Sequence, residues 1–136
     1  MIAPTLHLTN WSSTKLHGPG RKLTIMAKPR PWEHGEGKVP SMAPDRRWLD
    51  DLHHGEITPD AYRALCEERF KRSVKPPGKL LALRLGHVFA VADGDTLCCA
   101  CSRAEAAEGR CHRVWASRFL FLAGWRVILD GMEVAP

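Results

Sequence analysis

The sequence contains no apolar stretch approaching the roughly 20 residues that a membrane-spanning helix requires. Its first ten residues, MIAPTLHLTN, also lack the basic start and the long apolar run of a secretory signal peptide. These two absences argue against a membrane protein and a secreted protein. We therefore expect a cytoplasmic protein, or one that acts in the host cytoplasm if a phage encodes it.

The sequence also lacks the zinc-finger, RNA-recognition and basic-zipper signatures of dedicated nucleic-acid readers. Its net charge of +5 nevertheless suits an anionic partner. The basic residues are dispersed and interrupted by acids, aromatics and prolines, so the charge alone names no partner. Nucleic acid therefore stays a possible partner without support from a motif, and an ordinary solvated surface also explains the dispersed charge.

Cysteine is the unusual component of the composition. The chain has five cysteines, an odd number, and four of them lie in the segment LCCACSRAEAAEGRCHRVW, residues 97–115. Thiols of cytoplasmic proteins are kept reduced, so a cluster is more often structural, metal-binding or reactive than disulfide-bonded. The sequence therefore predicts a cysteine-rich site without disulfides.

The 136 residues predict one domain, 1–136, without internal repeats. Strands are expected at 5–10, 22–27, 87–91, 96–101 and 125–134, and helices after Asp45, after Thr58 and over 111–124. The segments 28–45 and 102–109 are expected to be loops, and 80–85 fits a helix or a strand equally well. The order predicts a three-layer α/β domain with a mostly parallel sheet, flavodoxin-like or Rossmann-like.

Three segments resemble one known family. They are MAPDRRWLDDLHHGEITPDAYRALCEERF, the strand TLCCAC, and the helix start GRCHRVWA. Together they resemble the "domain of unknown function 488" family, over roughly residues 6–130. The resemblance implies a compact α/β sandwich and no known reaction. Cys99 matches the family's strand cysteine, whereas Cys101 occupies the position where that family often has an acid.

A candidate site follows from the predicted strand–helix–strand unit. The loop after its first strand lies at the carboxyl edge of the sheet, where α/β proteins bind ligands. The N-terminus of the following helix attracts anions, and an arginine adds a two-pronged contact to phosphate. The predicted ligand-binding residues of this pocket are Arg30, Trp32, Cys99, Cys101, Arg110 and Arg113. The predicted ligand is an anionic small molecule of the nucleotide class, bound without a metal or cofactor.

Four alternatives stay open. The cysteine segment could be a buried strand followed by a simple helix cap. It could serve a thiol-dependent enzyme acting on a nucleotide or nucleic-acid component, with Cys111 and His112 as the catalytic pair. It could bind zinc through Cys99, Cys101, Cys111 and His112, although C-x-C-x9-C-H is not a common zinc spacing. Finally, the chain could be an interaction module, such as a phage-encoded inhibitor of a host protein.

Two expectations depend on where the helix start lies. A guanidinium at the helix N-terminus should face the ligand, so Arg113→Ala is expected to weaken phosphate binding while changing stability by less than about 1 kcal/mol. Cys111 is expected to react faster than Cys66, which lies on an apolar helix stripe.

Overall fold

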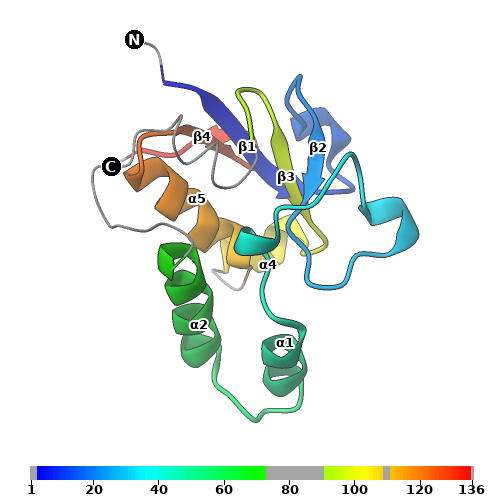
Figure 1. Ribbon diagram of the computed structural model, residues 1–136, viewed down its shortest axis with the longest axis vertical. Helices are drawn as coiled ribbons and strands as arrows, with labels where there is room; N and C mark the ends of the chain where they lie inside the picture. Colours follow the sequence, from blue (N-terminus) through cyan, green and yellow to red (C-terminus); the bar gives the residue numbers. More distant parts are fainter. Residues whose placement is uncertain (1–2, 73–90, 109–110, 136) are drawn as a thin grey trace.

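The computed structural model describes residues 3–72, 91–108 and 111–135. It is an α/β fold with a five-stranded sheet in the order β2-β3-β1-β4-β5 (Figure 1). β1 (Thr5–Asn10) runs parallel to both neighbours, β3 (Thr96–Cys99) and β4 (Arg126–Leu129). β2 (Lys22–Thr24) runs parallel to β3. The predicted α/β class and the mostly parallel sheet are therefore confirmed.

The last predicted strand, 125–134, is instead a hairpin of β4 and the antiparallel β5 (Met132–Glu133). Asp130 and Gly131 join them with positive φ angles of 48° and 81°. Two successive positive φ values define a type I′ turn, which Asp-Gly pairs favour. The single-strand prediction is wrong because this turn reverses the chain.

The two helices after β2 begin at the predicted caps. Asp45 accepts a hydrogen bond from the backbone of Arg47 at the start of α1 (Arg46–His53), and Thr58 caps α2 (Pro59–Arg72). The buried stripe of α2 is narrower than expected: Tyr62, Cys66 and Phe70 are buried, whereas Ala61 and Leu65 are exposed. Figure 1 shows both helices extending away from the sheet, with α2 beneath α5.

The segment between β3 and β4 contains two helices. Residues expected to form a loop include α4 (Arg103–Ala107), because Ser102 and Glu105 form a capping box at its start. α5 (His112–Leu122) follows, with Cys111 as its N-cap in an extended conformation. The buried side chains of α5 pack between the sheet and α2, and Trp115 contacts Tyr62 edge-on with ring centroids 5.6 Å apart. This layer contains the hydrophobic core.

The proline-rich segment after β2 is anchored to the sheet. It contains two 3-10 turns, Pro31–Glu33 and Pro40–Met42, and η1 (Thr14–Leu16) forms a similar turn before β2. Gly35 bridges to Leu23 with a φ of +57°. A Cβ at that position would collide with the carbonyl oxygen of Lys22, so the close approach requires glycine.

Three parts of the prediction fall on residues that the structure does not describe. They are the predicted strand 87–91, apart from its last residue, the segment 80–85, and Arg110. Among the helices that the structure describes, none has the length and apolar character to cross a membrane.

Candidate functional site

Four parallel strands bring their carboxyl ends to one edge of the sheet. Asn10, Cys99 and Leu129 close β1, β3 and β4, and Ile25 follows β2. α5 starts at the same edge because it follows β3 through α4. The Cys-His-Arg segment therefore lies against the ends of the strands, as the strand–helix–strand unit predicts.

Arg113 lies in the middle of this edge and has no exposed surface. Its Nη1 donates to the Sγ of Cys99 at 3.0 Å and to the backbone carbonyl of Cys101 at 2.8 Å. Its Nη2 donates to Oδ2 and Oδ1 of Asp130 at 3.0 and 3.1 Å. The expected position of this guanidinium in a solvent cleft is therefore wrong, since both terminal nitrogens bind groups inside the protein.

Asp130 is the counter-ion of Arg113. It occupies the first position of the β4–β5 turn, and its Oδ1 also accepts a hydrogen bond from the hydroxyl of Thr9 at 2.8 Å. The β4–β5 turn thus places a carboxylate between the C-terminal end of β1 and the N-terminal end of α5. A buried charge pair of this kind costs much stability when one partner is removed.

Three thiols lie next to the guanidinium. The Sγ atoms of Cys99 and Cys111 are 3.3 Å apart, and those of Cys99, Cys101 and Cys111 all lie within 4.8 Å of one another. Cys99 and Cys111 are buried, whereas Cys101 is partly exposed. Cys111 is as deeply buried as Cys66, with 1% exposure for each, so exposure does not favour the predicted faster reaction of Cys111.

The cluster divides into one acidic thiol and two weakly acidic ones. Hydrogen bonds from Cys101 and Cys111, aided by the positive charge of Arg113, hold the pKa of the Cys99 thiol well below its ordinary value despite burial. For Cys101, the hydrogen bond with Cys111 lowers the pKa, but the bond with Cys99 and burial together raise it to about 12. The pKa of Cys111 is raised, first by its bonds with Cys101 and Cys99 and then by burial.

His112 is fixed by the end of β2. Its Nε2 lies 2.7 Å from the carbonyl oxygen of Ile25, which only accepts, so Nε2 carries the proton. The other nitrogen, Nδ1, faces the Sγ of Cys111 at 4.0 Å. Burial lowers the pKa of the ring, which favours its neutral form.

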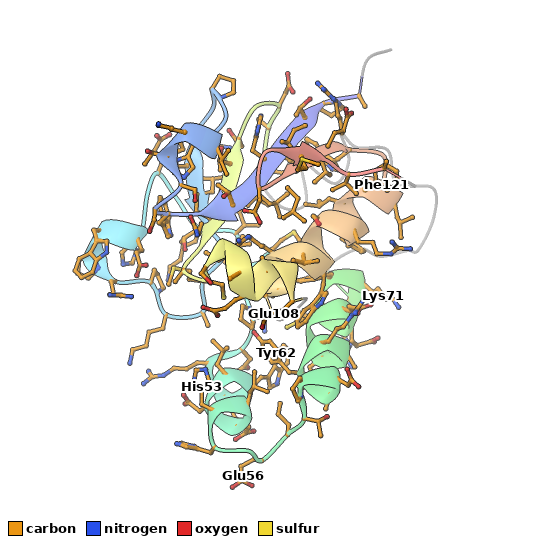
Figure 2. All side chains as sticks on the ribbon, turned by 180° about the vertical axis from the view of Figure 1, so that it is seen from behind. His53, Glu56, Tyr62, Lys71, Glu108 and Phe121 are labelled. Carbon is orange, nitrogen blue, oxygen red and sulfur yellow. The ribbon has the colours of Figure 1, made fainter. Side chains whose placement is uncertain are left out.

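A pocket of about 480 Å³ opens beside the cluster. Its lining comes from the ends of β2 and β3, from α1 and α2, and from the starts of α4 and α5. The residues are Met26, Ala27, Lys28, Pro44, Leu49, Leu52, His53, Tyr62, Cys99, Ala100, Cys101, Glu105 and His112. Figure 2 shows Tyr62 on the side of α2 that faces α1.

The structure separates the predicted site residues into two groups. Cys99, Cys101 and His112 line the pocket, and Cys111 and Arg113 contact Cys99 directly. Arg30 and Trp32 are not among the pocket-lining residues. The guanidinium of Arg30 instead stacks over the Trp32 ring, with its Cζ 5.3 Å from the ring centroid.

Three residues of this region are not among the predicted ligand-binding residues. The segment 28–37 is predicted to border the cleft, but Arg30 and not Lys28 is the cation predicted to contact the ligand. Tyr62 is predicted on the apolar stripe of the second helix, and Asp130 falls inside the predicted strand 125–134. The Asp-Gly pair at 130–131 was the one available signal, since it predicts a turn.

Searches against family models, curated proteins and solved structures found no match to this chain. The resemblance of the Cys-His-Arg segment to the "domain of unknown function 488" family therefore stays a prediction from the motif.

Proposed function

We propose that the protein binds an anionic small molecule of the nucleotide class in the pocket at the carboxyl edge of the sheet. The observation that carries the proposal is the pocket itself: about 480 Å³ lies within the range of small-molecule sites. Its place also supports the proposal, because open α/β sheets bind ligands outside the carboxyl ends of their strands.

The lining offers two kinds of contact. Leu49, Leu52 and Met26 provide an apolar wall for a flat ring system, and Tyr62 adds an aromatic side chain. Lys28 lies on the lining with an exposed side chain, so its ammonium can reach a phosphate without leaving water. In this proposal Lys28 replaces Arg113 as the cation that contacts the anion, because Arg113 is committed to Asp130.

Calorimetric titration tests this function with a nucleoside, the corresponding nucleoside mono- and diphosphates, and inorganic phosphate. We expect the phosphorylated compounds to bind more tightly than the nucleoside. Lys28→Ala should weaken their binding by about tenfold, the loss of one contact to a charged group. Lys71→Ala is the matched control, because Lys71 is exposed near the C-terminal end of α2 and does not line the pocket (Figure 2).

A blocking variant tests the pocket without altering its charge. Ala100 is exposed and lines the pocket, so Ala100→Trp should fill the pocket and abolish binding while the protein stays folded. If no compound binds the native protein, or if Ala100→Trp binds as the native protein does, the proposal is wrong.

Two alternative functions predict different experimental results for the purified protein and its variants. A thiol-dependent enzyme is favoured by the partly exposed thiol of Cys101 on the pocket lining. It predicts a ligand-dependent covalent adduct in denaturing mass spectrometry, which simple binding does not. An interaction module is favoured by Trp32, whose side chain is 70% exposed; it predicts partner binding that Trp32→Ala removes and Ala100→Trp leaves intact.

A further inference from the structure

The three clustered cysteines come from two separate parts of the chain. Cys99 ends β3 and Cys101 follows it, whereas Cys111 is the N-cap of α5. Their Sγ atoms lie within 4.8 Å of one another, with Cys99 and Cys111 at 3.3 Å. Four ligands at about 2.3 Å around a tetrahedral metal ion place sulfur atoms about 3.8 Å apart. The observed spacing brackets this value, so small side-chain rotations bring all three thiols onto one ion.

His112 supplies a fourth donor of the right kind. A metal-binding histidine usually donates its outer N–H to a carbonyl or carboxylate, which fixes the ring and frees the other nitrogen. His112 has this arrangement: Nε2 bonds the carbonyl oxygen of Ile25 at 2.7 Å, and Nδ1 lies 4.0 Å from the Sγ of Cys111. His112 is only 6% exposed, and its free lone pair on Nδ1 lies beside the Sγ of Cys111, so a modest rotation is needed to bring it onto an ion held by all three thiols.

Cys111 and His112 are adjacent in the sequence, and the conformation of Cys111 allows both side chains to reach one ion. Two adjacent residues within a helix point about 100° apart and rarely bind one ion. Cys111 lies outside the helix, with φ −103° and ψ 135°. It can therefore turn its thiol toward the cysteines of β3 while His112 begins the helix.

We propose that Cys99, Cys101, Cys111 and the Nδ1 of His112 bind one thiophilic metal ion, with Zn²⁺ as the expected occupant. Borderline and soft cations select thiolate and imidazole donors, and a Cys₃His set is a common structural zinc site. Three thiolates and one Zn²⁺ carry a net charge of −1. Arg113 stabilises two of these thiolates through hydrogen bonds, because its Nη1 lies 3.0 Å from the Sγ of Cys99 and 3.7 Å from that of Cys111, while its Nη2 pairs with Asp130.

The ion would lie in the floor of the pocket, since Cys99, Cys101 and His112 line it. The proposal does not depend on any pocket ligand: metal binding is measured with the metal alone. A failure of nucleotide binding therefore leaves the metal site untouched, and the reverse also holds.

The test is a titration of chelator-treated full-length protein with Co²⁺ and then Zn²⁺, in a non-thiol reductant that keeps all cysteines reduced. We expect about one equivalent of Co²⁺ to bind with sulfur-to-cobalt charge-transfer absorption and the intense visible bands of a tetrahedral site, and Zn²⁺ to displace it. Cys101→Ser should weaken Zn²⁺ binding by more than about a hundredfold, since even loss of an outer contact to a ligand costs ten- to a hundredfold.

Two cysteines outside the cluster are matched controls. Cys98 neighbours Cys99 in β3 but points to the other face, where its Sγ approaches the Nε2 of His17 at 4.0 Å. Cys66 lies on α2 and is buried. Cys98→Ser and Cys66→Ser each remove one thiol, and both should bind Zn²⁺ as the native protein does.

His112→Gln tests the fourth ligand and serves as a second variant if Cys101→Ser fails to fold. It should weaken Zn²⁺ binding by at least about tenfold and change the visible cobalt bands. The site is refuted if reduced protein gives no sulfur-to-cobalt absorption, or if Cys98→Ser weakens binding as much as Cys101→Ser. Unchanged cobalt bands in His112→Gln would overturn the assignment of His112 as a ligand.

Discussion

The start of α5 and the proline-rich segment after β2 each contain an arginine that the sequence suggests as an anion contact, and the two have opposite environments. Arg113 has no exposed surface and contacts Cys99 and Asp130. The side chain of Arg30 is 63% exposed and pairs with Glu33 in its own turn. The comparison teaches that the same residue type is buried where a carboxylate from a distant turn, Asp130, pairs with it, and stays exposed where its partner, Glu33, belongs to its own turn.

The largest expected effect is at Arg113. Arg113→Ala leaves the carboxylate of Asp130 and the Cys99 thiol without their cation, so we expect a loss of about 3–5 kcal/mol in the free energy of unfolding. Chemical denaturation of the reduced protein measures it. The sequence alone predicts that Arg113→Ala changes stability by less than about 1 kcal/mol, whereas the buried position predicts a large loss. A measured loss below about 1 kcal/mol would contradict the buried position and indicate that Arg113 lies at the surface.

A smaller effect is expected at the partner carboxylate. Asp130→Asn keeps a side chain that tolerates the positive φ but removes the charge, so it should cost about 1.5–3 kcal/mol. Glu133→Gln is the control in the same hairpin. Its pair with Arg126 is about half exposed on both sides, so water screens the pair and its loss should cost clearly less than the loss of the Asp130 charge. Equal losses in the two variants would contradict the buried pair.

The order in which the cysteines are alkylated tests, without any substitution, whether the start of α5 is buried. Cys101 is partly exposed, whereas Cys66, Cys98, Cys99 and Cys111 are buried. Limited alkylation of native, metal-free protein should therefore label Cys101 first, slowly because its pKa is raised to about 12. Peptide mapping identifies the site. First labelling at Cys111 would show instead that the start of α5 opens to solvent, as the sequence alone suggests.

The smallest effects are expected in the proline-rich segment. Trp32→Ala alters an exposed side chain, so it should change the free energy of unfolding by no more than about 0.5 kcal/mol. Arg30→Ala removes the guanidinium that pairs with the buried carboxylate of Glu33, which keeps its bond from the Arg30 backbone N–H, so it should cost about 1 kcal/mol. Neither residue lines the pocket, so nucleotide affinity should stay at the native value in calorimetry. A loss of affinity in either variant would show that this segment folds over the pocket when ligand binds.

Much of the fold was predictable because its signals are local. The alternation in Thr5–Asn10, the caps at Asp45 and Thr58, and the strand before the Cys-His-Arg helix all act within a few residues. The predictions failed where a competing local signal was overlooked. Ser102 and Glu105 start a short helix in the expected loop, and the Asp-Gly pair divides the last expected strand.

The sequence predicted that the clustered cysteines and His112 lie together, but it did not predict that Arg113 is buried beside them or that Arg30 and Trp32 lie outside the pocket lining. Sequence order alone placed Cys99, Cys101, Cys111 and His112 at one edge of the sheet, because parallel strands end together and the next helix begins there. The zinc interpretation was disfavoured because the linear spacing is uncommon. The proposed ligands come from a strand end and a helix start, and the fold rather than the linear spacing brings them together.

The sequence by itself determined the α/β class, the parallel strand pairing around the cysteine segment, and the presence of thiols beside a helix start. Only the tertiary structure decided which side chains face solvent there. Burial depends on what packs from distant parts of the chain: the β4–β5 hairpin brings Asp130 to Arg113, and β2 brings the carbonyl of Ile25 to His112. A charged side chain leaves water only where such a partner meets it, and no local pattern in the chain encodes that meeting.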